Sequence, residues 1–200
     1  IMDTLTLSPI GIVRCDRKYR YETPRQGVLA PESAGTIELL PGLNYEQALV
    51  QLDGFERIWI VYRFHLNDNW KPMVQPPRHT KDKVGVFATR SPHRPNPLGL
   101  SCVKLLDIDG LTLRIAELDM LDGTPVYDIK PYMPYSDSFP DAETGWASTG
   151  NTPDYSVAAT SIASHFMNWL HQRGVNLRGY AEVQLQFDPR NAERKRIAVH

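Results

Sequence analysis

The stretch LGLSCVKLLDIDGLTLRIAEL, residues 98–118, decides the fold class of this 200-residue chain. Two runs rich in aliphatic residues, 98–106 and 111–118, flank the four residues DIDG. An Asp-Gly pair between two such runs is a strong local signal for a tight β-hairpin, because glycine readily takes the positive φ that the turn requires. The stretch therefore predicts two antiparallel strands joined by a turn over 107–110.

Other segments on both sides of this hairpin have the composition of short strands, being rich in β-branched and aromatic residues and bounded by turn-forming residues. They are residues 5–14, 36–40, 57–66, 85–89 and 125–130. Asn44 is expected to cap a short helix whose apolar residues recur with helical spacing, and Gly54 is expected to end it. Six or seven strands with one small helix predict a mainly β domain that closes, or nearly closes, into a barrel.

The last third of the chain has a different character. Residues 133–153 are rich in proline, glycine and small polar residues without periodicity, which is typical of a linker. Residues 154–172 predict a helix with one apolar face, ended by Gly174. Residues 180–187 alternate, which favours a strand and leaves a helix as an open alternative. We therefore expect a C-terminal helical extension after the β domain.

Composition excludes several classes of protein. An apolar fraction of 42% supports a packed core rather than disorder, and no run approaches the roughly 18 apolar residues of a membrane helix. Cys15 and Cys102 stand alone, as expected of a reducing compartment, and the chain does not open on a secretory signal pattern, so we expect a cytoplasmic protein with no membrane partner. The usual dinucleotide, P-loop, nucleophile and metal-ligand motifs are absent, so no metal site is predicted.

Charge is unevenly distributed along a chain whose net charge is only −1. Residues 63–94 hold seven Lys and Arg against two acids, whereas residues 107–154 hold ten acids against two basic residues. Such segregation allows a basic face that suits a phosphate-bearing partner. The alternative, that the two segments neutralise each other across the fold, stays open at this point.

Two proline-rich segments combine rigidity with charge. Residues 89–101, TRSPHRPNPLGLS, carry three prolines that fix φ and would hold Arg90, Arg94 and Asn96 ready for a polar ligand. Residues 122–132, DGTPVYDIKPY, open with a tight turn and place Asp122 and Asp128 at the two ends of a short strand. Taken separately, each segment is more often a structural connection than a functional one.

Together, these two segments resemble the TsaA-like family of S-adenosylmethionine (SAM) dependent tRNA methyltransferases, also called TrmO or YaeB. The resemblance also includes PIGIVR at 9–14, TPRQG at 23–27 and GFERIWIVYRFHLN at 54–67, and it covers about residues 7–141. A further likeness, VQLQFDPRNAERKR at 183–196, is to the start of a small C-terminal domain. The resemblance implies a SAM-binding β-barrel domain at 1–141, followed at 142–200 by a linker, a helix and a partial C-terminal domain.

The resemblance also implies an activity and a set of binding residues. Members bind SAM, form homodimers and methylate N6 of the threonylcarbamoyl-modified adenosine beside the tRNA anticodon. Carried over by matched position, the cofactor contacts would be Gln26, Gly27, Val28, His65, Leu66, Arg90, Leu100, Asp122, Gly123, Thr124 and Pro125.

The chemistry of the reaction suggests further candidates. An exocyclic amine is a poor nucleophile, so an acceptor near its N–H and a stacking platform would help; we expect these roles from Asp128 and Tyr132. A single-stranded anticodon loop is recognised by stacking and by basic side chains. The candidate phosphate contacts are Arg78, Lys81, Lys83 and Arg94. Two alternatives remain: a SAM-binding protein of this fold with another RNA or small-molecule substrate, and a non-catalytic module that binds SAM or RNA.

Overall fold

The computed structural model describes residues 4–19, 27, 33–76, 82–148, 156–175, 177–178, 181 and 185. The chain divides into two compact units. The first comprises Ile1–Val74 with Gly85–Phe139, and the second comprises Gln75–Val84 with Pro140–His200. Among the described residues, none of the helices has the length and apolar character needed to cross a bilayer.

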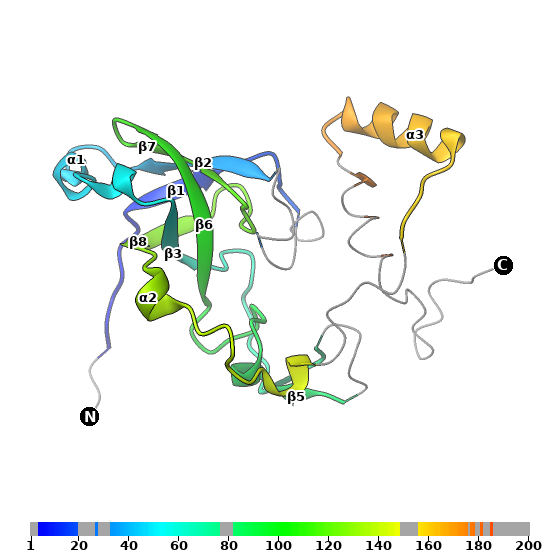
Figure 1. The fold of residues 1–200 in the computed structure, drawn as a ribbon, viewed down its shortest axis with the longest axis horizontal. Helices are drawn as coiled ribbons and strands as arrows, with labels where there is room; N and C mark the ends of the chain where they lie inside the picture. The colour runs from blue at the N-terminus through cyan, green and yellow to red at the C-terminus, as the bar shows by residue number, and fades with distance from the viewer. Residues whose placement is uncertain are drawn as a thin grey trace. The chain divides into compact units, whose positions relative to one another are not determined.

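The first unit is built on a closed barrel of antiparallel strands, as predicted (Figure 1). Around the barrel the strands follow the order β1-β2-β7-β6-β3-β8. Their bounds are Gly11–Arg14 (β1), Ala34–Leu39 (β2), Arg57–Arg63 (β3), Leu98–Asp109 (β6), Thr112–Ala116 (β7) and Pro125–Pro131 (β8). Closure leaves no unpaired sheet edge in the barrel, which removes the exposed backbone groups of an open sheet.

The predicted hairpin is present as β6 and β7, but its turn is shorter and later than expected. Asp109 pairs with Thr112, so that only Gly110 and Leu111 form the turn, and Gly110 has a φ of 57°. β6 therefore continues through the segment predicted as turn. A register shift between Leu105 and Asp107 marks a bulge, which keeps the strands paired as they twist.

The core follows from the two-residue period of the strands. In β3, Ile58 and Ile60 are completely buried and point inward, while the residues between them face outward. The barrel interior is otherwise aliphatic, and its completely buried members in β1, β2, β6, β7 and β8 are Val13, Ile37, Val103, Leu113, Ile115 and Val126.

Short elements connect the strands. They are α1 (Tyr45–Ala48), the 3-10 turn η3 (Leu52–Gly54), β4 (Met73–Val74), β5 (Val84–Gly85), the 3-10 turn η4 (Val86–Ala88) and α2 (Pro134–Asp137). Asn44 is the N-cap residue of α1, as predicted, but it makes no side-chain capping bond: its φ is 59°, and its side chain donates to Gln47 Oε1 instead of accepting from the backbone. The predicted strand at 85–89 is also mostly wrong, because the chain turns into η4 at Val86.

The second unit contains the 3-10 turn η5 (Gly145–Ser148) and the helix α3 (Ser161–His171). α3 begins later than the predicted 154, because Thr160 has extended backbone and its side chain accepts a capping hydrogen bond of 3.2 Å from Ala163 N–H. The helix is followed by Gly174 with a φ of 80°, as expected. Within 180–187 the structure describes only Ala181 and Leu185; both are helical, against the favoured strand.

Candidate functional site

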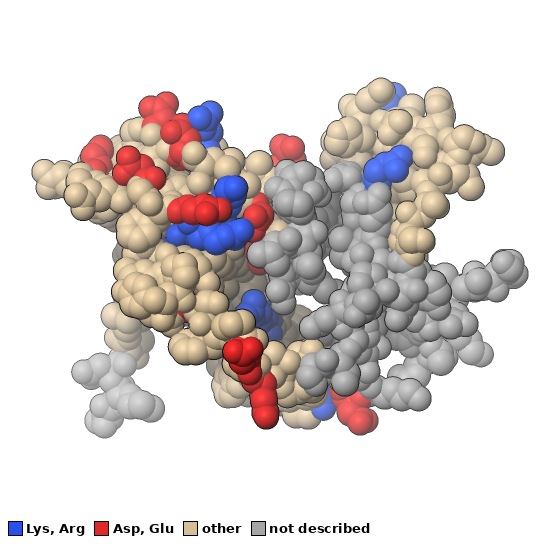
Figure 2. Space-filling view, in the orientation of Figure 1, with Lys and Arg blue, Asp and Glu red and all other residues tan. Residues whose placement is uncertain are grey.

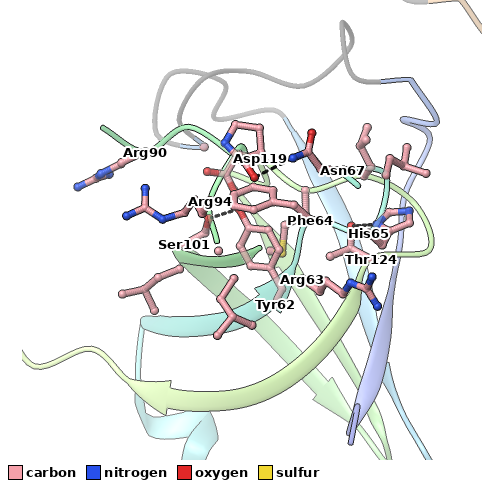
Figure 3. Close-up of a pocket in the computed structure, with 18 of the residues that line it drawn as sticks. Tyr62, Arg63, Phe64, His65, Asn67, Arg90, Arg94, Ser101, Asp119 and Thr124 are labelled. Carbon is pink, nitrogen blue, oxygen red and sulfur yellow. Dashed lines mark hydrogen bonds between the residues drawn. The ribbon is translucent and has the colours of Figure 1, made fainter. Parts of the chain in front are cut away.

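A cavity of about 620 Å³ lies at one end of the barrel (Figure 3). The strand register explains why several segments meet there. Tyr62, near the C-terminal end of β3, pairs with Gly99 near the start of β6 and with Val126 near the start of β8. The chain segments that leave or enter these strands therefore converge on one rim, although they lie far apart in the sequence.

The floor of the cavity is formed where the inward-facing rows of β3 and β6 change from aliphatic to aromatic and polar residues. A Cβ atom on Gly99 would lie 2.3 Å from the Tyr62 ring, so only glycine lets the ring lie across β6. The phenol oxygen of Tyr62 is 3.3 Å from Ser101 Oγ, and its ring meets Phe64 edge-on with centroids 5.2 Å apart. Burial, and then the nearby Asp119 carboxylate, raise the pKa of Tyr62, which keeps the phenol neutral.

Asp119 is an acid held inside this cavity. Burial is the largest influence and raises the pKa of its carboxyl group, while hydrogen bonds from Ser101 and from backbone groups, including that of Gly27, act in the opposite direction. Oδ1 of Asp119 is buried and has no hydrogen-bond partner among the described residues. A buried acceptor without a donor costs free energy unless a ligand satisfies it.

Three arginines also line the cavity. Arg63 and Arg90 are exposed, and neither forms an ion pair with any described residue. Arg94 instead donates through Nη1 to the carbonyl oxygens of Val86 and Thr89, at 3.2 and 2.7 Å. Arg94 thus fastens the proline loop, whereas Arg63 and Arg90 offer free guanidinium groups at the cavity.

The proline loop is fastened at its other side by Asn67. This buried side chain donates from Nδ2 to the carbonyl oxygens of Asn69 and Pro92, at 3.0 and 2.9 Å. His93 Nδ1 lies 2.8 Å from Asn69 Oδ1, and Phe64 N–H donates to the carbonyl of Pro97. These bonds give the loop a fixed path along the cavity, as its prolines predict.

The turn at 122–125 has a divided role. Asp122 Oδ1 accepts from the Cys15 N–H at 3.2 Å, and Gly123, with a φ of 77°, donates its N–H to the Val13 carbonyl. These contacts attach the turn to the end of β1. Thr124 lines the cavity, and its Oγ1 lies 3.3 Å from His65 Nδ1. Figure 3 shows this pair on the side of the cavity opposite to Arg90 and Arg94.

The structure brings together six of the eleven predicted cofactor residues. Those that line the cavity are Gly27, His65, Leu66, Arg90, Leu100 and Thr124. Asp122, Gly123 and Pro125 belong to the adjoining turn but are not among the lining residues. Gln26 and Val28 lie outside the described residues.

The two predicted catalytic residues lie on β8 and just after it. Neither is among the residues that line the cavity, but Tyr132 packs against Trp59, which is one of them. Asp128 forms an ion pair of 2.8 Å with Lys130 and accepts from the Ile129 N–H. The Tyr132 ring packs against Trp59, with centroids 5.8 Å apart. Their catalytic roles stay predictions. Within the described ranges, no three potential metal ligands are grouped together.

Of the predicted phosphate contacts, Arg78 and Lys81 lie outside the described residues, Lys83 is exposed and Arg94 lines the cavity. The ion pairs among described residues use none of the basic residues of 63–94; Arg114 and Lys130 instead pair with acids of their own segment, Asp107 and Asp128. Figure 2 shows acidic and basic side chains in contact on one face of the barrel unit. The acids of 107–154 that pair with basic residues of the same segment thus leave the described basic residues of 63–94 without an acidic ion-pair partner among the described residues.

Sequence reasoning did not single out Tyr62, Arg63, Ser101 or Asp119. Tyr62 and Ser101 sit within strands whose other inward residues are aliphatic, so they were indistinguishable from core positions without the register. Asp119 follows β7 and was counted only as one of ten acids. A usable signal was the polar residue Ser101 between Gly99 and Val103, on the face of β6 that must point inward.

Comparison with known proteins places this chain in a family. Residues 12–138 match the model of the tRNA-methyltransferase O N-terminal domain. The tRNA (adenine(37)-N6)-methyltransferase of Escherichia coli (strain K12) is 36% identical over 97% of this chain and 86% of that protein. A putative S-adenosylmethionine-dependent methyltransferase of Pseudomonas aeruginosa, RcsF, is 39% identical over 96% of this chain and 84% of its own length.

Solved structures agree with these relatives. The crystal structure of TrmO from P. aeruginosa superimposes with a TM-score of 0.72 at 35% sequence identity, covering 95% of this chain and 83% of that one. The likeness thus spans the barrel, its cavity and the segment beyond it. On this basis, and in agreement with the sequence resemblance, the chain belongs to the tRNA-methyltransferase O family.

Proposed function

We propose that this protein transfers a methyl group from SAM to N6 of a threonylcarbamoyl-modified adenosine beside the tRNA anticodon. The observation that carries the proposal is the cavity at the barrel end, lined by predicted cofactor residues from five separate segments of the chain. The names of the E. coli and P. aeruginosa relatives, a tRNA adenine-N6 methyltransferase and a SAM-dependent methyltransferase, support the reaction and the cofactor. A cytoplasmic homodimer with a SAM-binding domain at 1–141 is part of the same proposal.

The cavity suits SAM in size and chemistry. Its volume of about 620 Å³ is within the usual range for sites that bind small molecules. It combines apolar and aromatic surface with free guanidinium groups and a buried carboxyl group, which match the adenosine, the carboxylate and the positive charges of the cofactor. When bound, SAM supplies a methyl group on a positively charged sulfur that needs no further activation.

The residues of the chain mainly position the reactants. Arg63 and Arg90, free of ion pairs with described residues, would hold a carboxylate or a phosphate at the rim by paired N–H donors. Tyr62 and Phe64 would exclude water from the floor. Because the proline loop is already fixed by Asn67 and Arg94, it would lose little conformational entropy when a ligand binds beside it.

The N6 amine needs an acceptor for its proton as the new bond forms. Asp128 and Tyr132 remain our candidates for acceptor and stacking platform. In the free protein Asp128 is paired with Lys130, so it would have to exchange this partner for the amine. The role of Asp128 as acceptor is tested by Asp128→Asn, which should lower the rate of transfer and leave SAM affinity unchanged.

The proposal is tested by measuring methyl transfer from labelled SAM to two tRNA pools. One pool comes from cells that make threonylcarbamoyl-adenosine, and the other from cells that cannot. We expect label only in the first pool, at the adenine next to the anticodon. Equal labelling of both pools would discard the modified substrate and keep the enzyme class. Absence of label in both, with SAM binding shown by calorimetry, would favour the non-catalytic binding module.

A further inference from the structure

We infer that Asp119 makes the site selective for the positively charged methyl donor over the neutral product that remains after transfer. This inference rests on the proposed function, because it names SAM as donor and S-adenosylhomocysteine as product. It assigns a role to an acid that neither the sequence motifs nor the family resemblance singles out. The supporting observations are the burial of this acid, its unsatisfied oxygen and the positions of the surrounding charges.

Asp119 occupies the inner part of the cavity. It directly follows Leu118, which is completely buried, and precedes Met120, which is 2% exposed. Ser101 and the Gly27 backbone act on its carboxyl group and oppose the effect of burial on its pKa, but the buried Oδ1 has no partner among the described residues. In Figure 3 Asp119 lies between the two arginines on one side and the His65–Thr124 pair on the other. One carboxylate oxygen of a residue that lines the cavity is therefore without a hydrogen-bond donor among the described residues.

The charge of Asp119 is only partly compensated in the free protein. Arg17 attracts the carboxylate, and its guanidinium donates to the neighbouring Leu118 carbonyl at 2.8 Å. Tyr62, on β3, faces the same carboxylate and is neutral. A buried carboxylate whose charge is only partly compensated is destabilising, so a cation entering the cavity would be attracted to it.

SAM has two positively charged groups, an ammonium and a sulfonium, and the positions of the arginines indicate which of them would lie beside Asp119. Arg90 and Arg94, which Figure 3 shows on one side of the cavity, would attract the carboxylate of the methionine part, whose ammonium group is attached to the same carbon. The sulfonium is the remaining positive charge. It is weakly hydrated and carries no N–H, so it suits an interior site beside a carboxylate and the Tyr62 ring.

The transfer step removes this charge. The S–CH₃ bond breaks and its electron pair stays on sulfur, a C–N bond forms to N6 of the adenine, and the N6 proton passes to the acceptor proposed above, Asp128, and from there to water. Sulfur thereby changes from positive to neutral, and the charge of Asp119 is again only partly compensated. The free energy that favoured binding of the donor is lost for the product, which promotes its release.

The experiment is a calorimetric titration of the full chain with SAM and, separately, with S-adenosylhomocysteine. The variants are Asp119→Asn, which removes the charge and keeps the shape, and the matched control Asp107→Asn, an exposed carboxylate on the β6–β7 hairpin. We expect Asp119→Asn to weaken SAM binding at least about ten-fold and product binding less than about two-fold. The control should change neither affinity.

An equal loss of affinity for both ligands, or no loss for either, would overturn the inference. Binding of neither ligand by the unaltered chain would overturn the cofactor assignment, and the inference with it. Conversely, charge-selective binding that depends on Asp119, without label in either tRNA pool, would uphold the inference and reject the proposed substrate.

A melting experiment without ligand separates this role from a structural one. Since burial raises the pKa of Asp119, its carboxylate destabilises the folded state once pH rises above its ordinary range. Asp119→Asn should therefore melt at the same or a higher temperature than the unaltered chain at neutral pH. A clear fall in melting temperature would show that Asp119 serves the fold instead.

Discussion

The two ends of the barrel interior differ sharply, although the same strands build both. In β3 the inward-facing row passes from Ile58 and Ile60 to Tyr62, and in β6 it passes back from Val103 to Ser101 and Gly99. One end is therefore an aliphatic core, and the other opens into a cavity whose lining adds polar and charged side chains to apolar ones. A closed barrel thus supplies stability and a site from one set of strands, with the division made within two or three residues.

The largest effect is expected in the aliphatic end. Ile60→Ala truncates a completely buried side chain and leaves a cavity in the aliphatic core, so the free energy of unfolding should fall by about 2–5 kcal/mol. Urea denaturation measures this loss. The affinity for SAM of the molecules that remain folded should be unchanged. A comparable loss of affinity would show that the two ends do not act separately.

The boundary between the two ends is set by Gly99. In Gly99→Ala the new methyl group would meet the Tyr62 ring, so we expect a loss of about 1–3 kcal/mol in stability together with weaker SAM binding. Denaturation and calorimetry on the same preparation check both effects. The matched control is Gly54→Ala, where nothing lies within 4 Å of the added Cβ. Equal behaviour of the two variants would contradict our account of the boundary.

The polar end itself is tested by two arginines with different surroundings. Arg94→Ala removes two hydrogen bonds to loop carbonyls and should lower stability by about 1–2 kcal/mol. Arg90→Ala removes an exposed side chain, so stability should stay within about 0.5 kcal/mol while SAM affinity falls. Thermal melting and calorimetry separate these outcomes. Full SAM affinity in Arg90→Ala would mean that we have misplaced the cofactor carboxylate.

A smaller effect concerns pH and lies outside the cavity. The Arg57 guanidinium bonds both carboxylate oxygens of Glu117, at 2.8 and 2.9 Å, and holds the pKa of Glu117 below its usual range. A lowered folded-state pKa stabilises the protein at neutral pH, and this contribution is lost as pH falls through that value. Stability should thus fall less on acidification in Glu117→Gln than in the unaltered chain, as measured by denaturation at about pH 7 and about pH 3.

The smallest effect is expected for a single exposed lysine. Lys83 forms no ion pair with a described residue, whereas Lys130 is paired with Asp128. If Lys83 contacts phosphate, Lys83→Ala should weaken tRNA binding a few-fold and reduce the slope of its salt dependence by about one. Lys130→Ala serves as the control and should leave the slope nearly unchanged. An identical slope in all three proteins would show that Lys83 is not part of the surface that binds tRNA.

Local patterns in the sequence predicted the strands and the barrel well, because alternation and turn residues act over a few positions. They did not predict the ends of elements that are set by a longer-range contact or by a single capping side chain. The start of α3 depends on the Thr160 side chain, and the turn of the hairpin on which residue pairs with Asp109. The family motifs led to six residues of the cavity.

Tyr62, Ser101 and Asp119 could not be found in this way. They become neighbours only through barrel closure and strand register. Tyr62 and Ser101 lie within stretches that carry the family resemblance, but nothing in the local sequence distinguishes them from core positions. Asp122 shows the converse, since a conspicuous motif residue is occupied in attaching its turn to Cys15. Motifs thus located the rim of the site, while its interior required the fold.

The central claim is that the polar end of the barrel is the SAM site, and a crystal structure of the protein with bound SAM tests it most directly. We predict density for the cofactor in the cavity between Arg90 and Thr124, with the sulfonium beside the Asp119 carboxylate. Density for the cofactor at any other place on the chain, or a carboxylate end directed toward Asp119, would contradict the account.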